Sequence, residues 1–220
     1  MSQSPIPDFT VDLFMALFEM DAEAEPAADG SPTGLNYYGR YRHPDQAKPQ
    51  TEPSWTQRLK ELLEAFGHTV RKECSYPDSP GCSPSNFCDN VVTFADGRIL
   101  WLENKGAWKD YWVRKGMLGK FRSHLLVSQN SAAHDVQKLA PLVGPHADYV
   151  GLLLIGFDTI SDPMDAEMDE FRRVTLLDRL PWMTASVNWP DRWRVGHRIW
   201  AWFFWRTVEG EGSAYPTSSS

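Results

Sequence analysis

Three ionisable side chains, Asp89, Glu103 and Lys105, stand at the ends of two apolar segments of the chain. Carboxylates that face each other on neighbouring strands repel, so such a pair is costly unless a cation lies between them. A hard divalent cation such as Mg²⁺ takes oxygen ligands, which carboxylates provide. The residue types therefore predict a site in which Asp89 and Glu103 bind a metal ion and the Lys105 ammonium lies beside it.

The segments on either side of Ala95–Gly97 have the composition of two β-strands. Val, Thr, Phe, Ile, Leu and Trp are frequent from Asn90 to Phe94 and from Arg98 to Leu102, and turn-forming residues separate the two runs. The stretch therefore predicts a β-hairpin, and its strands extend to Asp89 on one side and to Glu103 on the other.

The length of the hairpin loop decides whether the two carboxylates meet. A three-residue loop places Asp89 directly across from Glu103, whereas a two-residue turn places it across from Asn104, on the other face of the sheet. Gly97 favours the longer loop, because the last residue of such a loop adopts a left-handed conformation. Lys105 follows Glu103 by two residues and so lies on the same face of the strand.

An Asp, a hairpin and a Glu-x-Lys motif in this order resemble the PD-(D/E)XK, or restriction-endonuclease-like, nuclease superfamily. The resemblance covers this motif and the order of elements from about Thr51 to Asp158, and Cys88 stands where the family pattern has proline. It implies an α/β fold with a mixed central β-sheet flanked by helices and an αβββαβ core, to which the sequence itself adds a C-terminal aromatic strand. It also implies hydrolysis of phosphodiester bonds with Mg²⁺ or Mn²⁺ as cofactor.

The resemblance implies roles for individual residues. Asp89 and Glu103, together with the backbone carbonyl of Asn104, would hold the metal, and Lys105 would position the attacking water or stabilise the transition state. Members of the superfamily often carry a further acid on the first helix and a Gln or Lys on the helix after the hairpin. The candidates for these accessory positions are Glu52, Glu61, Glu64, Gln129 and Gln137.

The distribution of charge is compatible with a nuclease. The net charge of −7 argues against a general nucleic-acid coat protein, but the local field matters more than the sum. Between Arg98 and Arg122, seven basic residues accompany only two acidic ones. This local excess predicts a nucleic-acid partner, DNA in the first instance. The side chains expected to contact it are Trp108, Lys109, Arg114 and Lys115, of which Trp108 and Lys109 could instead only cover the sheet edge.

Hydrophobic periodicity predicts the elements around the hairpin. In chain order, we expect a helix over Pro53–Phe66, a strand over His68–Tyr76, the hairpin, a helix within Gly119–Leu142 that is interrupted near Ser128–Ser131, a buried strand over Tyr149–Phe157, a helix over Met164–Leu180 and one or two strands over Arg192–Val208. The last region is aromatic on both faces, which is typical of an internal strand or of an interface with a second copy or another protein.

The composition suggests three parts. An amphipathic helix over Asp8–Met20 and a linker from Asp21 to Gln50 make up residues 1–50, a nuclease-like core takes residues 51–208, and a flexible tail takes residues 209–220. The N-terminal helix is expected to dock on the core or on a partner.

The cysteines and the hydropathy suggest a cytoplasmic location without a membrane partner. Three cysteines, an odd number, fit a reducing compartment, no apolar run has the length of a membrane span, and the N-terminus lacks a signal-peptide pattern. Cys74, Cys82 and Cys88 could bind zinc with His68, but their spacing lacks the close cysteine pairs of structural zinc sites. Buried thiols are the expectation.

Two interpretations from other classes stay open. The same fold could bind nucleic acid or protein without cutting it. Alternatively, the hairpin charges could form a surface salt bridge in a structural protein whose aromatic C-terminal strand serves as an interface, because short motifs also arise by chance. Metal binding separates the nuclease from both.

Overall fold

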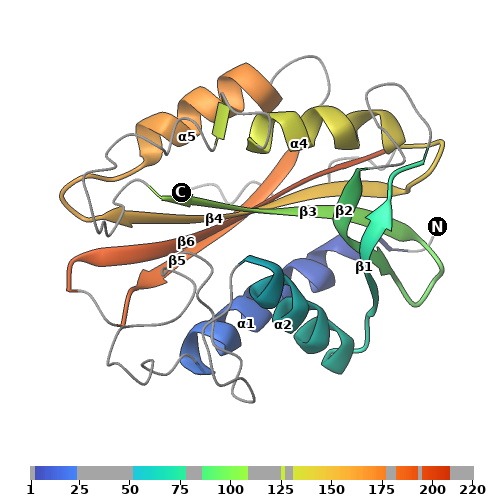
Figure 1. The fold of residues 1–220 in the computed structure, drawn as a ribbon, viewed down its shortest axis with the longest axis horizontal. Helices are drawn as coiled ribbons and strands as arrows, with labels where there is room; N and C mark the ends of the chain where they lie inside the picture. The colour runs from blue at the N-terminus through green and yellow to red at the C-terminus, as the bar shows by residue number, and fades with distance from the viewer. Residues whose placement is uncertain are drawn as a thin grey trace.

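The computed structural model describes residues 3–23, 52–77, 86–108, 125–126, 131–176, 182–192 and 195–208. These residues form a mixed β-sheet with helices on both faces (Figure 1). The elements are α1 (Ile6–Glu23), α2 (Glu52–Ala65), β1 (Thr69–Ser75), β2 (Phe87–Thr93), β3 (Ile99–Trp108), α4 (Ala132–Leu139), a 3₁₀ turn (Ala140–Leu142), β4 (Tyr149–Thr159), α5 (Asp165–Phe171), a π-helical turn (Arg172–Leu176), β5 (Met183–Pro190) and β6 (His197–Thr207).

The sheet has six strands in the order β1-β2-β3-β4-β6-β5. β3 and β4 run parallel and α4 lies on the connection between them, whereas every other neighbouring pair is antiparallel. The prediction of an α/β fold with a mixed central sheet flanked by helices is therefore confirmed. From α2 to β4 the described elements follow the order helix, three strands, helix, strand.

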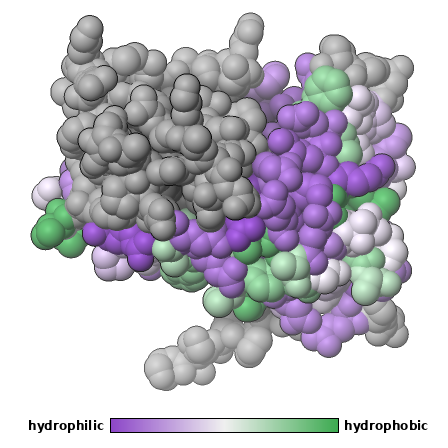
Figure 2. All heavy atoms as spheres, turned by 60° about the horizontal axis from the view of Figure 1, so that its bottom comes forward, coloured by the Kyte–Doolittle hydropathy of each residue, from purple (hydrophilic) through white to green (hydrophobic). Residues whose placement is uncertain are grey.

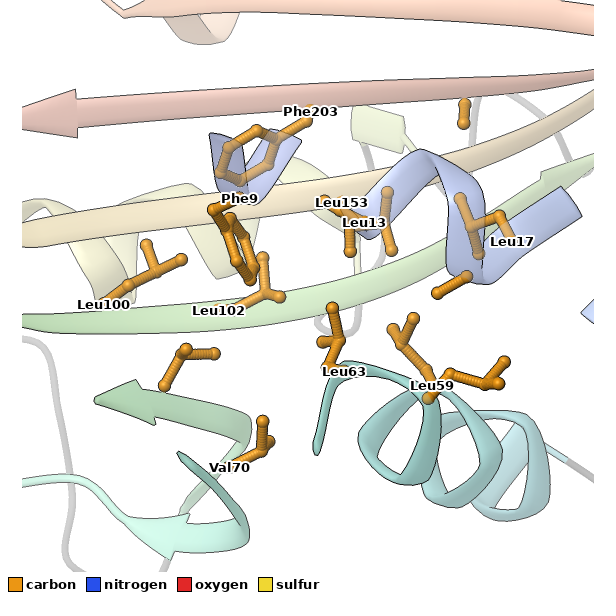
Figure 3. Close-up of a cluster of buried hydrophobic side chains, with 14 of the residues drawn as sticks. Phe9, Leu13, Leu17, Leu59, Leu63, Val70, Leu100, Leu102, Leu153 and Phe203 are labelled. Carbon is orange, nitrogen blue, oxygen red and sulfur yellow. The ribbon is translucent and has the colours of Figure 1, made fainter. Parts of the chain in front are cut away.

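One hydrophobic core fills the space between the sheet and the pair α1 and α2 (Figure 3). α1 contributes Phe9, Leu13 and Leu17, which recur at helical spacing on one face and are fully buried. They meet Leu102 of β3 and Phe203 of β6 in the same cluster. The N-terminal helix therefore docks on the body, and the packed unit contains residues on both sides of position 50.

A second apolar layer lies on the opposite face, beneath α4 and α5 (Figure 1). Val91 and Trp101 of the hairpin pack there with Leu139 of α4, while Leu152 and Leu154 of β4 lie beneath α5. β4 is buried on both faces along nearly its whole length, as its continuous apolar sequence predicted.

β6 is the aromatic C-terminal strand, and it is internal. It lies between β4 and β5, and the rings of Trp202, Phe203, Phe204 and Trp205 are all buried. Of the two alternatives for this strand, the internal one is confirmed. β5, an edge strand, was not foreseen.

Several boundaries differ from the prediction. Asp21–Glu23 belong to α1 rather than to the linker, because Asp21 is buried and bonded to Trp189. The expected helix over Met164–Leu180 ends as an α-helix at Phe171. The remainder of the expected linker and the expected tail, residues 24–51 and 209–220, lie outside the described residues.

The described surface is mainly polar on the α1–α2 side. Figure 2 turns this side toward the viewer, and hydrophilic residues make up most of the coloured surface, with smaller hydrophobic areas between them. Among the described residues, no helix combines the length and the apolar composition that crossing a membrane requires.

Candidate active site

The hairpin has the predicted register. Thr93 pairs with Ile99 and Asn90 pairs with Leu102, so the same register puts Asp89 opposite Glu103. The loop closes with a hydrogen bond from the amide of residue 94 to the carbonyl of residue 98, 2.9 Å, and its last residue, glycine 97, has a φ of +88°. The three-residue loop inferred from the left-handed glycine is thus confirmed.

The two carboxylates lie at the far end of the hairpin from this loop. Glu103 is 4% exposed, and Asp89 accepts a hydrogen bond at Oδ2 from the backbone N–H of Asn104, 2.8 Å. Burial, followed by the nearby charge of Glu103, raises the pKa of Asp89 well above its usual range. The pair therefore resists carrying two negative charges at once.

Glu103 is held by donors from the residue after β1 and from α4. Its Oε1 accepts a hydrogen bond from the Tyr76 hydroxyl, and the Lys138 Nζ lies 3.1 Å from the same oxygen. Tyr76 follows β1 directly and stacks on Trp101 of β3, with ring centroids 5.5 Å apart. Burial raises the pKa of Tyr76, so its hydroxyl keeps its proton and acts as a donor.

Asp135 of α4 links the two lysines of the site. Its Oδ1 lies 2.7 Å from the Lys138 Nζ and its Oδ2 lies 3.2 Å from the Lys105 Nζ. Burial alone would lower the pKa of Lys138, but Glu103 and Asp135 together raise it, so the side chain stays a cation. Because Glu103 and Lys105 both contact α4, they share one face of β3, as the two-residue spacing predicted.

The start of α4 fixes which of its residues face the sheet. Ser131 caps the helix by accepting a hydrogen bond from the His134 N–H, 3.3 Å. Asp135 and Lys138, three residues apart, then lie on the same side. Gln137, the predicted accessory residue, is exposed and lies outside this network. Its neighbour Lys138 lies inside the network, with its Nζ 3.1 Å from Glu103 Oε1.

The acids of α2 lie elsewhere. α2 packs on the α1 face of the sheet, opposite α4 (Figure 1). Glu64 is exposed and pairs with Lys60, 2.6 Å, and Glu61 accepts hydrogen bonds from Gln57 and Arg58. These acids occupy solvated helix-face positions away from the described carboxylates.

The structure leaves other predicted site residues without side-chain geometry. Glu52 is the first residue of α2 and Trp108 the last of β3. Lys109, Arg114, Lys115 and Gln129 lie outside the described residues.

The cysteine region shows no zinc-like grouping in the part that the structure describes. Cys74 and Cys88 are partners across β1 and β2, and the buried Cys88 thiol donates toward the carbonyl of Leu102, 3.4 Å. His68 binds Asp12 of α1 instead, at 2.8 Å. Cys82 lies outside the described residues.

Two carboxylates of the described hairpin could hold a cation. Nowhere in the described ranges do three or more His, Cys, Asp or Glu side chains gather as metal ligands. Asp89 and Glu103 offer two carboxylates, and Mg²⁺ is commonly held by one or two carboxylates with several waters. Comparison of the chain with protein-family models, curated proteins and solved structures finds no match. The chemistry of the site therefore rests on its own geometry.

Proposed function

We propose that the protein is a metal-dependent nuclease that hydrolyses phosphodiester bonds of DNA or RNA with Asp89, Glu103 and Lys105. One observation carries this proposal. Continued by one residue past the Asn90–Leu102 pair, the hairpin register would set Asp89 opposite Glu103, and the pKa of Asp89 is raised by burial and by Glu103. Such a pair is costly without a cation, and a divalent metal is the cation that carboxylate oxygens suit.

Each residue has a task in this mechanism. Asp89, Glu103 and the backbone carbonyl of Asn104 would hold Mg²⁺ or Mn²⁺. When bound, the metal supplies the positive charge that makes a water a stronger nucleophile and neutralises the scissile phosphate. Hydrolysis forms a bond from the water oxygen to phosphorus and breaks the bond from phosphorus to the leaving sugar oxygen; the attacking water gives up a proton and the leaving sugar oxygen takes one up. Lys105 would stabilise the charge that develops on the phosphoryl oxygens.

The surrounding residues support this use of Lys105. Asp135, 3% exposed, holds the Lys105 Nζ at 3.2 Å. An ammonium held by a buried carboxylate loses less freedom when it acts on a substrate than one that moves freely. The basic residues that follow β3 in the sequence would supply the attraction to the phosphate backbone, and substrate binding would then weaken strongly as salt is added.

A second candidate is a nuclease-like fold that binds nucleic acid or protein without cutting. The observation in its favour is that Glu103 already has a cationic neighbour in Lys138. Buried networks of this kind also occur as purely structural features. The third interpretation, a surface salt bridge, fits less well, because Glu103 is 4% exposed and its described ion pair runs to α4.

Cleavage assays on mixed DNA and RNA substrates test the proposal. The wild-type protein is compared with Asp89→Asn and Lys105→Ala in the presence of Mg²⁺ or Mn²⁺. Asp165→Asn and Lys60→Ala are matched controls, because Asp165 is exposed on α5 and Lys60 lies on α2. We expect metal-dependent cleavage that both site variants lose and both controls keep.

Two other results would count against the proposal. If no substrate is cut and calorimetry detects no Mn²⁺ binding, the metal site is wrong and a binding or structural role takes its place. Cleavage that persists in both site variants would put the active site elsewhere in the chain or trace the activity to a contaminant.

A further inference from the structure

Lys138 is a half-buried cation shared by two buried carboxylates. Its Nζ lies 2.7 Å from Asp135 Oδ1 and 3.1 Å from Glu103 Oε1. The two carboxylate side chains are 4% and 5% exposed, and the lysine side chain is 13% exposed. One ammonium thus compensates a carboxylate of α4 and a carboxylate that the proposed function assigns to the metal.

We propose that Lys138 is an internal counter-ion of Glu103 that competes with the divalent metal, so that Lys138 sets how tightly the site binds it. This inference rests on the proposed function, because it takes Glu103 as a metal ligand. Asp135 keeps the Lys138 ammonium paired when Glu103 binds the metal.

Lys138 and the metal compete for Glu103 because both are cations, and the lysine side chain is flexible enough to move away. Two cations close to one carboxylate repel, and the repulsion is stronger in a buried place than in water. The ammonium of a lysine sits on a flexible four-carbon stem, so a small shift toward Asp135 lets it retreat while α4 stays in place. Asp135 lies 2.7 Å from it already, so the retreat does not leave the ammonium unpaired.

Tyr76 touches the same oxygen of Glu103 and provides a contrast. Its hydroxyl is a neutral donor, so it orients the carboxylate without competing in charge. Removing Tyr76's hydroxyl should loosen Glu103 and weaken metal binding. Removing the charge of Lys138 should strengthen it. The two neighbours of one oxygen are thereby expected to act in opposite directions.

A Mn²⁺ titration by calorimetry tests the inference without any substrate. The proteins are the wild type, Lys138→Met, Lys138→Arg, Tyr76→Phe and the control Lys60→Met, whose lysine pairs with Glu64 on α2. We expect Lys138→Met to lower the Kd for Mn²⁺ at least about tenfold, from the removal of one charge near the site. Lys138→Arg and Lys60→Met should stay near the wild type, and Tyr76→Phe should raise the Kd.

The outcomes separate this inference from the proposed function. A Kd that is unchanged or higher in Lys138→Met overturns the competition, whatever the wild type cuts. If Lys138→Met binds more tightly but no protein cleaves nucleic acid, the competition stands and the nuclease proposal falls. Absence of Mn²⁺ binding in every protein overturns both. Lys138→Gln removes the charge but keeps a donor for Asp135, and it replaces Lys138→Met if circular dichroism shows the latter unfolded.

Discussion

The two faces of the β2–β3 hairpin use alternate residues of the same strands for opposite purposes. Leu100 and Leu102 point into the core under α1 and α2, whereas Trp101 and Glu103 point toward α4. The face toward α1 and α2 is apolar at these positions. The face toward α4 carries an apolar residue, Trp101, next to the charged Glu103. The comparison teaches that, because side chains alternate between the two faces of a strand, a charged site residue can be the direct neighbour of a core residue in the sequence.

Glu103→Gln tests the charged face and has the largest expected effect. The substitution keeps the shape of the side chain but removes the charge that binds the metal and pairs with Lys138. Cleavage should fall about 10³-fold or more, because a metal ligand is lost. The rate is measured with a fluorescent oligonucleotide, and chemical denaturation follows stability. Full activity in the variant would remove Glu103 from the site.

Leu102→Ala tests the apolar face one residue away. Leu102 is fully buried in the core shared by α1, α2 and the sheet. Truncation should lower the free energy of unfolding by about 2–5 kcal/mol, with cleavage per folded molecule little changed. Val195→Ala, at a fully exposed position, is the matched truncation and should cost almost nothing. A loss of specific activity at full stability would show that the two faces are not independent.

The features that depend on local sequence could be predicted. The hairpin register followed from the loop length and from Gly97, because both act within a few residues. β4 followed from its continuous apolar run. The alternation Met183-Thr-Ala-Ser-Val-Asn-Trp-Pro190 also carries a period of two that marks β5, and this signal was missed.

The α4 side of the site could not be read from the sequence. Each residue of a helix turns by about 100°, so Gln137 and Lys138 face different directions and the choice between them needs the phase of the helix. That phase depends on the cap at Ser131, inside the stretch where the sequence predicted an interruption. The apolar spacing of Ala132, Val136 and Leu139 does not decide it, because Gln137 and Lys138 lie almost equally far from the centre of that stripe. The pairing of Asp135 with Lys105 depends on tertiary packing alone.

Asp21→Asn tests a buried charge beside the core that α1 and α2 form with the sheet. Asp21 lies in the last turn of α1, is 7% exposed and accepts a hydrogen bond from the Trp189 indole, 3.0 Å. Burial raises its pKa from 3.8 to about 6, against the opposing effect of that hydrogen bond. Between these values the folded state holds a proton that the unfolded state releases. This group therefore makes stability fall as the pH rises from about 4 to about 6.

The variant should therefore be more stable than the wild type at pH 7, by at most about 3 kcal/mol, and similar to it near pH 4. Asparagine keeps an oxygen that can accept from Trp189. Urea denaturation of both proteins across this pH range gives the difference directly. A variant that is less stable at pH 7 would mean that the ionised carboxylate is well compensated, by Arg192 among others.

The smallest expected effect concerns Asn90, a polar residue on the apolar face of β2. Its side chain is fully buried, and its amide oxygen and nitrogen have no hydrogen-bond partner within the part of the chain that the structure describes. A buried amide without partners is costly, and valine suits a buried strand better. Asn90→Val should therefore raise the free energy of unfolding by about 1 kcal/mol. Asn188→Val, on the exposed side of β5, controls for strand propensity. A variant that loses stability instead would show that the amide is satisfied by water or by a ligand. The face that carries Leu100 and Leu102 would then be less purely apolar than the two leucines suggest.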